Sequence, residues 1–158
     1  MGKCTAVTNC WIAGNAAGSG GGASGSTLTH CMLTNNVCTY RGSGFKTCTL
    51  YNCRVVGNKK GASFNAGGGG YDGACYNCLI ANNRQTGTDS CGAGGVCGYL
   101  AGKIADYSFC KIVNCTVTEN DGGSSPGGVN VLDAPVRKMI IIARACNCSI
   151  EDLLDEIP

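Results

Sequence analysis

The sequence is poor in the large apolar residues that fill most protein cores. Leu, Ile, Val and Phe together account for 30 of the 158 residues, and charged residues make up only 14% of the chain. A large aliphatic core is therefore excluded. The formal net charge is +2, which is too low for a chain that stays unfolded through self-repulsion. We expect a folded protein that packs around residues other than Leu and Phe.

Long apolar stretches are also missing. No run approaches the roughly 18 apolar residues that suggest a membrane-spanning helix. The start of the chain, Met1-Gly2-Lys3, leads into no hydrophobic signal segment. We therefore expect neither a membrane span nor an export signal in this chain. Its length suits one compact domain.

Glycine and cysteine are abundant, with 26 and 14 residues. This cysteine content is close to that of secreted disulfide scaffolds. A zinc ribbon needs two close cysteine pairs at matching spacing. The pair Cys75 and Cys78 has the Cys-x-x-Cys spacing, but Cys91 and Cys97 make a poor second pair. We expect no metal and no cofactor, and we interpret the thiols as small apolar side chains that are buried.

Five segments share the pattern Asn-Cys-x-aliphatic-x-x-Asn, with His30 in place of the first Asn in one of them. The central cysteines follow one another at steps of 21, 22, 25 and 37 residues, which suits the coils of a solenoid. These central cysteines are Cys10, Cys31, Cys53, Cys78 and Cys115.

Apolar residues occupy two fixed sites around each central cysteine. The residues between these sites vary freely, as outward residues do when side chains alternate along a strand. The period of two predicts strands, and the glycine content disfavours helices. The inward sites are Val7, Leu28, Leu50, Cys75 and Ile112 before the cysteine, and Ile12, Leu33, Val55, Ile80 and Val117 after it.

The residue before each central cysteine interrupts the alternation and predicts a bend. It is Asn in four copies and His30 in the fifth. Asn tolerates left-handed backbone angles, and its side chain bonds to neighbouring backbone, so Asn repeated in successive coils is expected to stack as a ladder. A second ladder is predicted where each short strand ends, at Asn15, Asn36, Asn58, Asn83 and Asn120.

These repeats, with the Gly-rich turns between them, resemble the right-handed parallel β-helix of pectin-lyase-like proteins, in particular its Gly- and Asn-rich bacterial surface and adhesin-like branch. The resemblance covers residues 4 to 130. It implies an all-β solenoid of about five to six coils over residues 1–130, with strands about 4.8 Å apart, and a location on the cell surface or outside the cell. The cysteines would form an internal column, in which the β-carbons lie slightly too far apart for relaxed disulfides, so free thiols are favoured.

The composition changes near residue 131, where glycine disappears and acidic residues accumulate. Pro135 suits a first helical turn, and Ser149 with Asp152 is typical of a capping box. Residues 131–158 are predicted to form a cap of two short helices, although Asn147-Cys148 also fits a sixth coil. Within this segment, the stretch from Met139 to Leu154 is also similar to the closing helices of repressor-type helix-turn-helix domains. The DNA-reading part of that family has no counterpart, so no nucleic-acid binding is expected.

The resemblance also raises the possibility of chemistry, because many right-handed β-helices act on acidic polysaccharides through clustered carboxylates. A polysaccharide lyase or glycoside hydrolase is therefore the alternative function, with Asp89, Asp106, Glu119 and Asp121 as its candidate catalytic residues. No two acidic residues before the tail share an outward position in successive coils, which favours a non-catalytic role. His30 is interpreted as a structural substitute for Asn.

Binding is better supported than catalysis. Tyr51 and Tyr76 occupy the same outward site in consecutive coils, next to Arg54. A tyrosine ring with its polar tip suits a sugar face or a partner protein, and packing between exposed neighbours also explains the pair. We interpret the chain as a non-catalytic structural or adhesin-like module that binds carbohydrate or protein. A filament subunit that associates through its coil ends or C-terminal helices is a further alternative.

Overall fold

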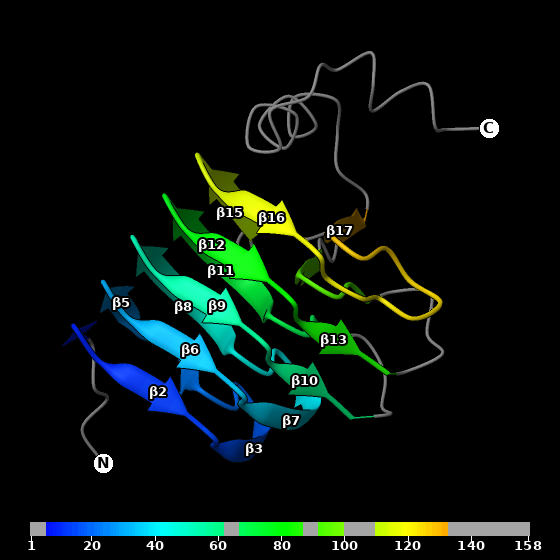
Figure 1. The fold of residues 1–158 in the computed structure, drawn as a ribbon, viewed down its shortest axis with the longest axis horizontal. Coiled ribbons are helices and arrows are strands. Elements are labelled where there is room, and N and C mark those ends of the chain that lie inside the picture. The colour runs from blue at the N-terminus through cyan, green and yellow to red at the C-terminus, as the bar shows by residue number, and fades with distance from the viewer. Residues whose placement is uncertain (1–5, 62–66, 87–91, 100–109, 133–158) are drawn as a thin grey trace.

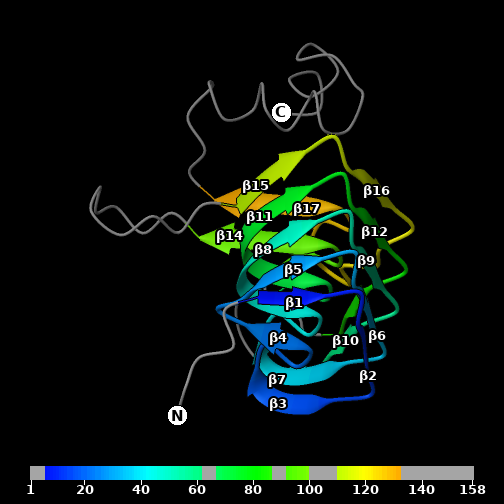
Figure 2. The same ribbon diagram turned by 90° about the vertical axis from the view of Figure 1, so that its left-hand side faces the viewer.

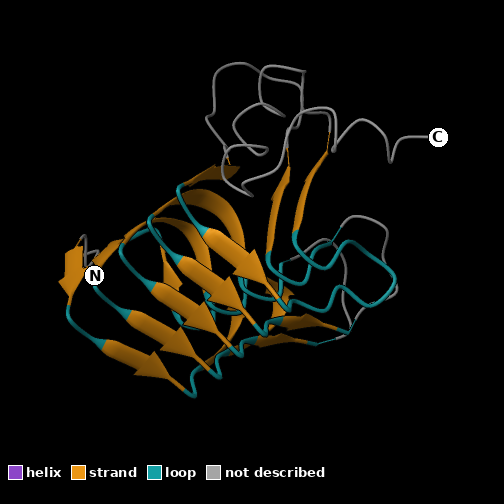
Figure 3. Ribbon diagram, turned by 45° about the horizontal axis from the view of Figure 1, so that its top comes forward, coloured by secondary structure: helices purple, strands orange, loops and turns teal. Residues whose placement is uncertain are grey.

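A computed structural model describes residues 6–61, 67–86, 92–99 and 110–132. Within these ranges the chain is all-β and winds into a solenoid whose strands form three parallel sheets (Figure 1). Where the connections are described, loops rather than helices join the strands (Figure 3). The predicted all-β parallel solenoid is confirmed. Across the described ranges, no helix is long and apolar enough to span a membrane.

Each sheet runs along the solenoid on a different side of it, with its strands stacked coil upon coil (Figure 2). The first sheet contains β1 (Ala6–Thr8), β4 (Ala23–Ser24), β5 (Thr27–Thr29), β8 (Phe45–Tyr51), β11 (Gly70–Tyr76), β14 (Val96–Tyr99), β15 (Cys110–Val113) and β17 (Val129–Leu132). The second sheet contains β2 (Trp11–Ala13), β6 (Met32–Thr34), β9 (Arg54–Val56), β12 (Leu79–Ala81) and β16 (Thr116–Thr118). The third sheet contains β3 (Ala16–Ser19), β7 (Val37–Arg41), β10 (Lys59–Lys60) and β13 (Arg84–Gln85).

The predicted inward sites line the core in register. In the second sheet, Leu33 is aligned with Val55 and Val55 with Ile80, and all three are fully buried. In the first sheet, Leu28 and Leu50 are aligned and fully buried in the same way. Since equivalent residues of successive coils meet one another, a narrow core forms from few aliphatic side chains, in keeping with the composition.

Two bends separate the sheets. The bend between the first and second sheets, called the first corner below, holds the residue before each central cysteine. All five of these residues have left-handed backbone angles, with φ between 51° and 56°: Asn9, His30, Asn52, Asn77 and Asn114. The second corner lies between the second and third sheets, where φ is between 51° and 68° at Gly14, Asn35, Gly57, Asn82 and Glu119. Both corners therefore use residues that tolerate this backbone conformation, with the exception of Glu119.

The asparagines that follow the second corner form a continuous hydrogen-bonded ladder. Each one except Asn120, the last, donates its backbone N–H and its side-chain amide to the Oδ1 atom of the next coil's asparagine, at 2.9–3.1 Å. From the second coil onward, the amide also donates to a carbonyl oxygen of the preceding coil, at 2.8–2.9 Å. Asn36, Asn58 and Asn83 are fully buried. The ladder thus satisfies polar groups inside the solenoid, where water does not reach them.

A column of glycines packs against this ladder from the opposite side. A Cβ atom on Gly44 would lie 2.5 Å from the carbonyl oxygen of Gly69 and 3.1 Å from the side-chain nitrogen of Asn58. Gly22 and Gly69 approach Asn36 and Asn83 in the same way. The glycine turns also bond to one another through the backbone, as in the bond from the Gly44 N–H to the Gly69 carbonyl at 2.8 Å. Glycine is needed in these turns because the neighbouring coil leaves no room for a side chain.

The central cysteines form an internal column of free thiols behind the first corner. The backbone N–H groups of Cys31, Cys53 and Cys78 each donate to the sulfur of the next coil's cysteine, at 3.3–3.4 Å. Each thiol donates to the carbonyl oxygen two residues before it, at 3.2–3.3 Å. Hydrogen bonds with Cys78 lower the pKa of Cys53 and the pKa of Cys115 to about 7. The same bonds, first the one with Cys115 and then the one with Cys53, raise the pKa of Cys78.

The last part of the solenoid differs in detail from the prediction. The prediction was five to six coils, but fewer coils than this have a strand in all three sheets. The third sheet ends at β13 and continues only as a bridge from Arg84 to Asp121. Strand β17 pairs with β14 and runs across the boundary placed at residue 131. The predicted helical cap and the competing sixth coil fall on residues 133–158, which lie outside the described residues.

Candidate binding groove at the first corner

Outward side chains form two rows, one on each side of the first corner. Their alignment follows from the strand register, which places equivalent residues of successive coils next to one another. The row on the first sheet consists of Thr8, Thr29, Tyr51, Tyr76 and Val113. The row on the second sheet consists of Trp11, Met32, Arg54, Leu79 and Thr116.

A shallow groove of about 420 Å³ lies along this corner over the first three coils. It is lined by Asn9, Cys10, Trp11, His30, Cys31, Met32, Asn52 and Arg54. The indole of Trp11 is 72% exposed, more than any other large apolar side chain in the part of the chain that the structure describes. We call this depression the corner groove. Its walls combine an exposed aromatic ring with polar corner side chains, which is the mixture found in many ligand sites.

The three predicted binding residues lie close to this groove but have different roles. Tyr51 and Tyr76 stack face to face, with ring centroids 5.0 Å apart and an angle of 11° between the planes. Lys111 places its ammonium group 5.3 Å from the Tyr76 centroid. Packing between neighbours therefore occupies the facing surfaces of both rings. Arg54 lies across the corner and lines the groove directly.

The charge along the first corner is positive. Arg54 is exposed in the groove wall, and Lys111 is exposed beside the tyrosine stack. His30, also exposed, adds an imidazole in the groove. Among the lining residues, all of which belong to the described ranges, none is acidic. The groove therefore offers hydrogen-bond donors and positive charge to a ligand, together with the flat surface of Trp11.

Sequence reasoning placed Trp11 and Met32 at outward positions but did not select them as site residues. The motif describes one coil at a time, whereas the groove is shared by three coils. The alignment of the position after each central cysteine was the available signal, because it places Trp11 beside Met32 and Met32 beside Arg54.

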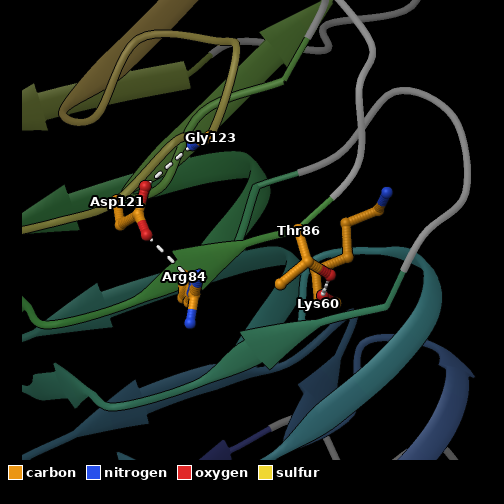
Figure 4. A network of polar contacts seen from close by, with 5 residues as sticks. All are labelled: Lys60, Arg84, Thr86, Asp121 and Gly123. Atoms are coloured by element: carbon orange, nitrogen blue, oxygen red, sulfur yellow. Dashed lines mark hydrogen bonds and ion pairs between the residues drawn. The ribbon is translucent and has the colours of Figure 1, made fainter.

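The candidate catalytic carboxylate Asp121 is engaged in structural contacts (Figure 4). Its Oδ2 atom lies 3.0 Å from Nε of Arg84, and its Oδ1 atom accepts the backbone N–H of Gly123 at 2.9 Å. Both side chains of the ion pair are more than half exposed. This pair lies at the third sheet, where Asp121 also bridges to Arg84 through the backbone. The contacts orient the carboxylate toward Arg84 and the following turn.

The other candidate acids do not complete a catalytic centre in the described structure. Glu119 is exposed at the second corner, in the position that other coils fill with Gly or Asn. Asp89 and Asp106 lie outside the described residues. No group of three or more His, Cys, Asp or Glu side chains in the described ranges is arranged to hold a metal ion. The assignment of a catalytic site to these four acids stays a prediction.

A buried polar cluster in the third sheet was not anticipated from the sequence. Cys38 and Lys60 are aligned in adjacent strands, and both side chains point inward and are buried. The Ser43 hydroxyl donates to the Cys38 sulfur at 3.3 Å. Burial raises the pKa of the Cys38 thiol, although Ser43 and the charge of Lys60 act in the opposite direction. The neighbouring backbone is tied by the Thr86 hydroxyl, which donates to the Lys60 carbonyl oxygen at 2.7 Å (Figure 4).

No protein-family model, curated protein or solved structure matches this chain. What the structure supports is a parallel β-solenoid. The finer resemblance to pectin-lyase-like and adhesin-like proteins enters only as part of the proposal that follows.

Proposed function

We propose that this chain is a non-catalytic, adhesin-like β-solenoid module that binds an acidic carbohydrate chain along the corner groove. The observation that carries the proposal is the groove itself, in which the exposed ring of Trp11 lies on the same corner as Arg54 and His30. A surface or secreted protein is the setting in which such a module meets polysaccharides, and this location is part of the proposal.

The chemistry of the groove selects the ligand class. The flat apolar face of an indole packs well against the apolar face of a sugar ring, while its N–H remains available to a hydroxyl group. A guanidinium binds carboxylate or sulfate groups through paired N–H donors. An acidic polysaccharide carries apolar sugar faces and acidic groups at regular intervals along its chain. The corner likewise carries side chains at regular intervals from coil to coil.

The scaffold supports binding because it holds these side chains in place before the ligand arrives. Each corner residue is fixed by a left-handed backbone turn, and the neighbouring coils are tied by the cysteine and asparagine hydrogen bonds. A site that is ordered in advance loses less conformational entropy on binding. A loosely held Trp11 and Arg54 would bind the same ligand more weakly.

The proposal is tested by retention of the purified chain on immobilised acidic and neutral polysaccharides, with release of shortened products recorded in parallel. We expect retention on the acidic polymers only, weakened by salt because exposed charges are screened, and no products. Trp11→Ala and Arg54→Ala should each lower retention on the order of tenfold, as expected for loss of a central contact worth more than about 1 kcal/mol.

Two matched variants on the third sheet serve as controls. Tyr40→Ala removes an aromatic ring that is 55% exposed, and Lys59→Ala removes an exposed positive charge. Both should be retained like the wild type. If Lys59→Ala lost as much retention as Arg54→Ala, the net charge of the protein would explain the binding, and a specific site in the groove would be contradicted. Release of products would instead establish the lyase or hydrolase alternative.

A further inference from the structure

The cysteine column begins at the surface and continues into the core. Cys10 is exposed, and Cys10 and Cys31 both line the corner groove. Cys53, Cys78 and Cys115 follow at the equivalent position of the next coils, and all three are buried. Solvent therefore reaches the first sulfur atom, that of Cys10, of a row that continues from the buried Cys31 through the solenoid.

We propose that this column binds thiophilic monovalent cations, Cu(I) foremost, each held between the sulfur atoms of two neighbouring coils. Thiolate sulfur is a soft ligand that selects Cu(I) over harder ions. A structural zinc site needs four ligands, and the described residues hold no group of even three His, Cys, Asp or Glu side chains suited to a metal. The column offers pairs of sulfurs, and Cu(I) is stable with two sulfur ligands in a line.

The spacing of the strands fits such a pair. Neighbouring strands lie about 4.8 Å apart, and the strands that follow Cys53, Cys78 and Cys115 are paired in register. A zinc–thiolate bond is about 2.3 Å long, and the bonds of a two-coordinate Cu(I) ion are somewhat shorter, so an ion midway between two sulfurs holds them slightly closer together than the strand spacing. A disulfide needs its sulfurs about 2.05 Å apart and would draw the coils together. The column therefore accepts an ion with less distortion than a disulfide.

The backbone provides the second requirement, which is compensation of charge. A Cu(I) ion held by two cysteines replaces two thiol protons, which pass to solvent, so the ion and its two thiolates carry one net negative charge. Where one sulfur bridges two ions, two ions replace three protons and the net charge of the group is again minus one. Copper remains Cu(I) throughout, and nothing is oxidised or reduced. The N–H groups of Cys31, Cys53 and Cys78 already point at the next sulfur from 3.3–3.4 Å. Such donors stabilise metal-bound thiolates in a buried site.

This inference does not rest on the carbohydrate proposal, because it uses the sulfur atoms rather than Trp11 or Arg54. Its test is an anaerobic titration of the full, reduced chain with Cu(I), in competition with a chromophoric Cu(I) chelator. X-ray absorption of the loaded protein then reports the ligands. We expect copper coordinated by two sulfurs, with bonds shorter than the about 2.3 Å of tetrahedral zinc–thiolate sites, and without nitrogen or oxygen ligands.

Two single-thiol variants separate the column from the rest of the cysteines. Cys78→Ser removes the sulfur shared by two pairs and should lower both the number of tightly bound ions and the affinity, by roughly tenfold or more. Cys38→Ser removes a buried thiol of the third sheet that lies outside the column, and it should bind copper like the wild type.

A third variant guards against loss of folding. Cys115→Ser removes the sulfur at the far end of the described column and should lose one pair where Cys78→Ser loses two. Circular dichroism shows whether each variant keeps its strands. The proposal is overturned if folded Cys78→Ser and Cys115→Ser keep the wild-type stoichiometry and affinity, if Cys38→Ser loses as much as they do, or if the absorption spectrum shows nitrogen or oxygen ligands.

Discussion

Each buried asparagine of the ladder satisfies polar groups of two neighbouring coils. The Asn58 amide donates to the Leu33 carbonyl at 2.9 Å and to Oδ1 of Asn83 at 3.0 Å. Its own Oδ1 atom accepts two N–H donors from Asn36, each at 3.0 Å. Because all of these groups are shielded from water, each one left without a partner costs about 1–3 kcal/mol.

Asn58→Ala should therefore lower the free energy of unfolding by about 3 kcal/mol or more, since several buried groups lose their partner together. Urea-induced unfolding followed by circular dichroism measures this difference. Lys59→Ala, at the exposed neighbouring residue, should change the free energy by less than about 0.5 kcal/mol. A loss below about 1 kcal/mol for Asn58→Ala would show that the ladder does not hold the coils together as described.

Glu119 gives a second test at the same scale. It is exposed and has φ of 52°, whereas the equivalent residue in the other coils is Gly or Asn. A left-handed backbone costs a residue with a Cβ atom about 1 kcal/mol or more. Glu119→Gly should raise the free energy of unfolding by roughly 0.5–1 kcal/mol, part of the strain being offset by the greater entropy of the unfolded chain. A clear loss of stability would indicate that the carboxylate makes a contact worth more than the strain.

These residues also show where sequence reasoning succeeds and fails. The residue before each central cysteine, which is Asn in four coils and His30 in one, predicted a bend, and its left-handed φ confirms it. Glu119 was interpreted as a candidate catalytic acid because the second corner had not been recognised as a repeated position. Aligning it with Gly57 and Asn82 would have indicated a backbone role, since those residue types share one conformational property.

At the scale of elements, the glycine turns and the asparagine ladder depend on each other. A methyl group on Gly44 meets the backbone oxygen of Gly69 at 2.5 Å, closer than real Cβ contacts allow, so one coil must shift away from the next. The shift would also strain the contact with Asn58. Turn and ladder therefore pack as one layer in each coil.

Gly44→Ala should lower the free energy of unfolding by about 2 kcal/mol or more, because overpacking of a tight interior costs about 1–3 kcal/mol. Gly18→Ala is the matched control: Gly18 lies in β3, a Cβ atom there meets nothing within 4 Å, and its φ is not in the left-handed range. It should be neutral or slightly stabilising. Thermal unfolding of the two variants measures this difference. Equal unfolding temperatures for Gly44→Ala and Gly18→Ala would contradict the close packing of the turns.

The first two sheets were predictable from alternation, and the third was not. The inward residues of the first two sheets are mostly aliphatic or Cys in every coil, so the period of two is visible in the sequence. The inward residues of β10 and β13 are Lys60 and Gln85, both fully buried. Such residues usually face solvent, and the pattern at these positions therefore indicated loops. Only the stacking of coils reveals that they share a register with Cys38.

For the whole molecule, the many buried thiols link stability to pH. Burial raises the pKa of Cys48 above its ordinary value of 9.0, and the nearby Cys75 adds to the rise. The unfolded chain then releases this proton at a lower pH than the folded chain does. The contribution of Cys48 is thus fully present below pH 9.0 and is lost as the pH rises toward its raised folded value.

Cys48→Ala should accordingly reduce the loss of stability at alkaline pH. We expect the difference in unfolding free energy between the wild type and the variant to shrink as the pH rises above 9.0. Urea unfolding at several pH values measures it. A difference that stays constant over this range would mean that Cys48 ionises equally in the folded and unfolded chains.

The corner groove is a property of the whole molecule, because no single coil contains it. Its residues come from three copies of the repeat, and their alignment depends on steps of 21 and 22 residues that bring Trp11, Met32 and Arg54 together. The sequence predicted the coils and the outward positions. It did not predict a groove, because the depth of the corner depends on how far each side chain extends in three dimensions.

The most direct measurement is a titration of the tryptophan fluorescence with acidic and neutral oligosaccharides. The chain contains one tryptophan, Trp11, so its emission reports on the corner groove alone. We predict a saturable change in emission with the acidic oligosaccharide, absent with the neutral one and abolished in Arg54→Ala. Binding of the acidic oligosaccharide, seen by calorimetry, without any change in the emission of Trp11 would contradict the groove as the binding site.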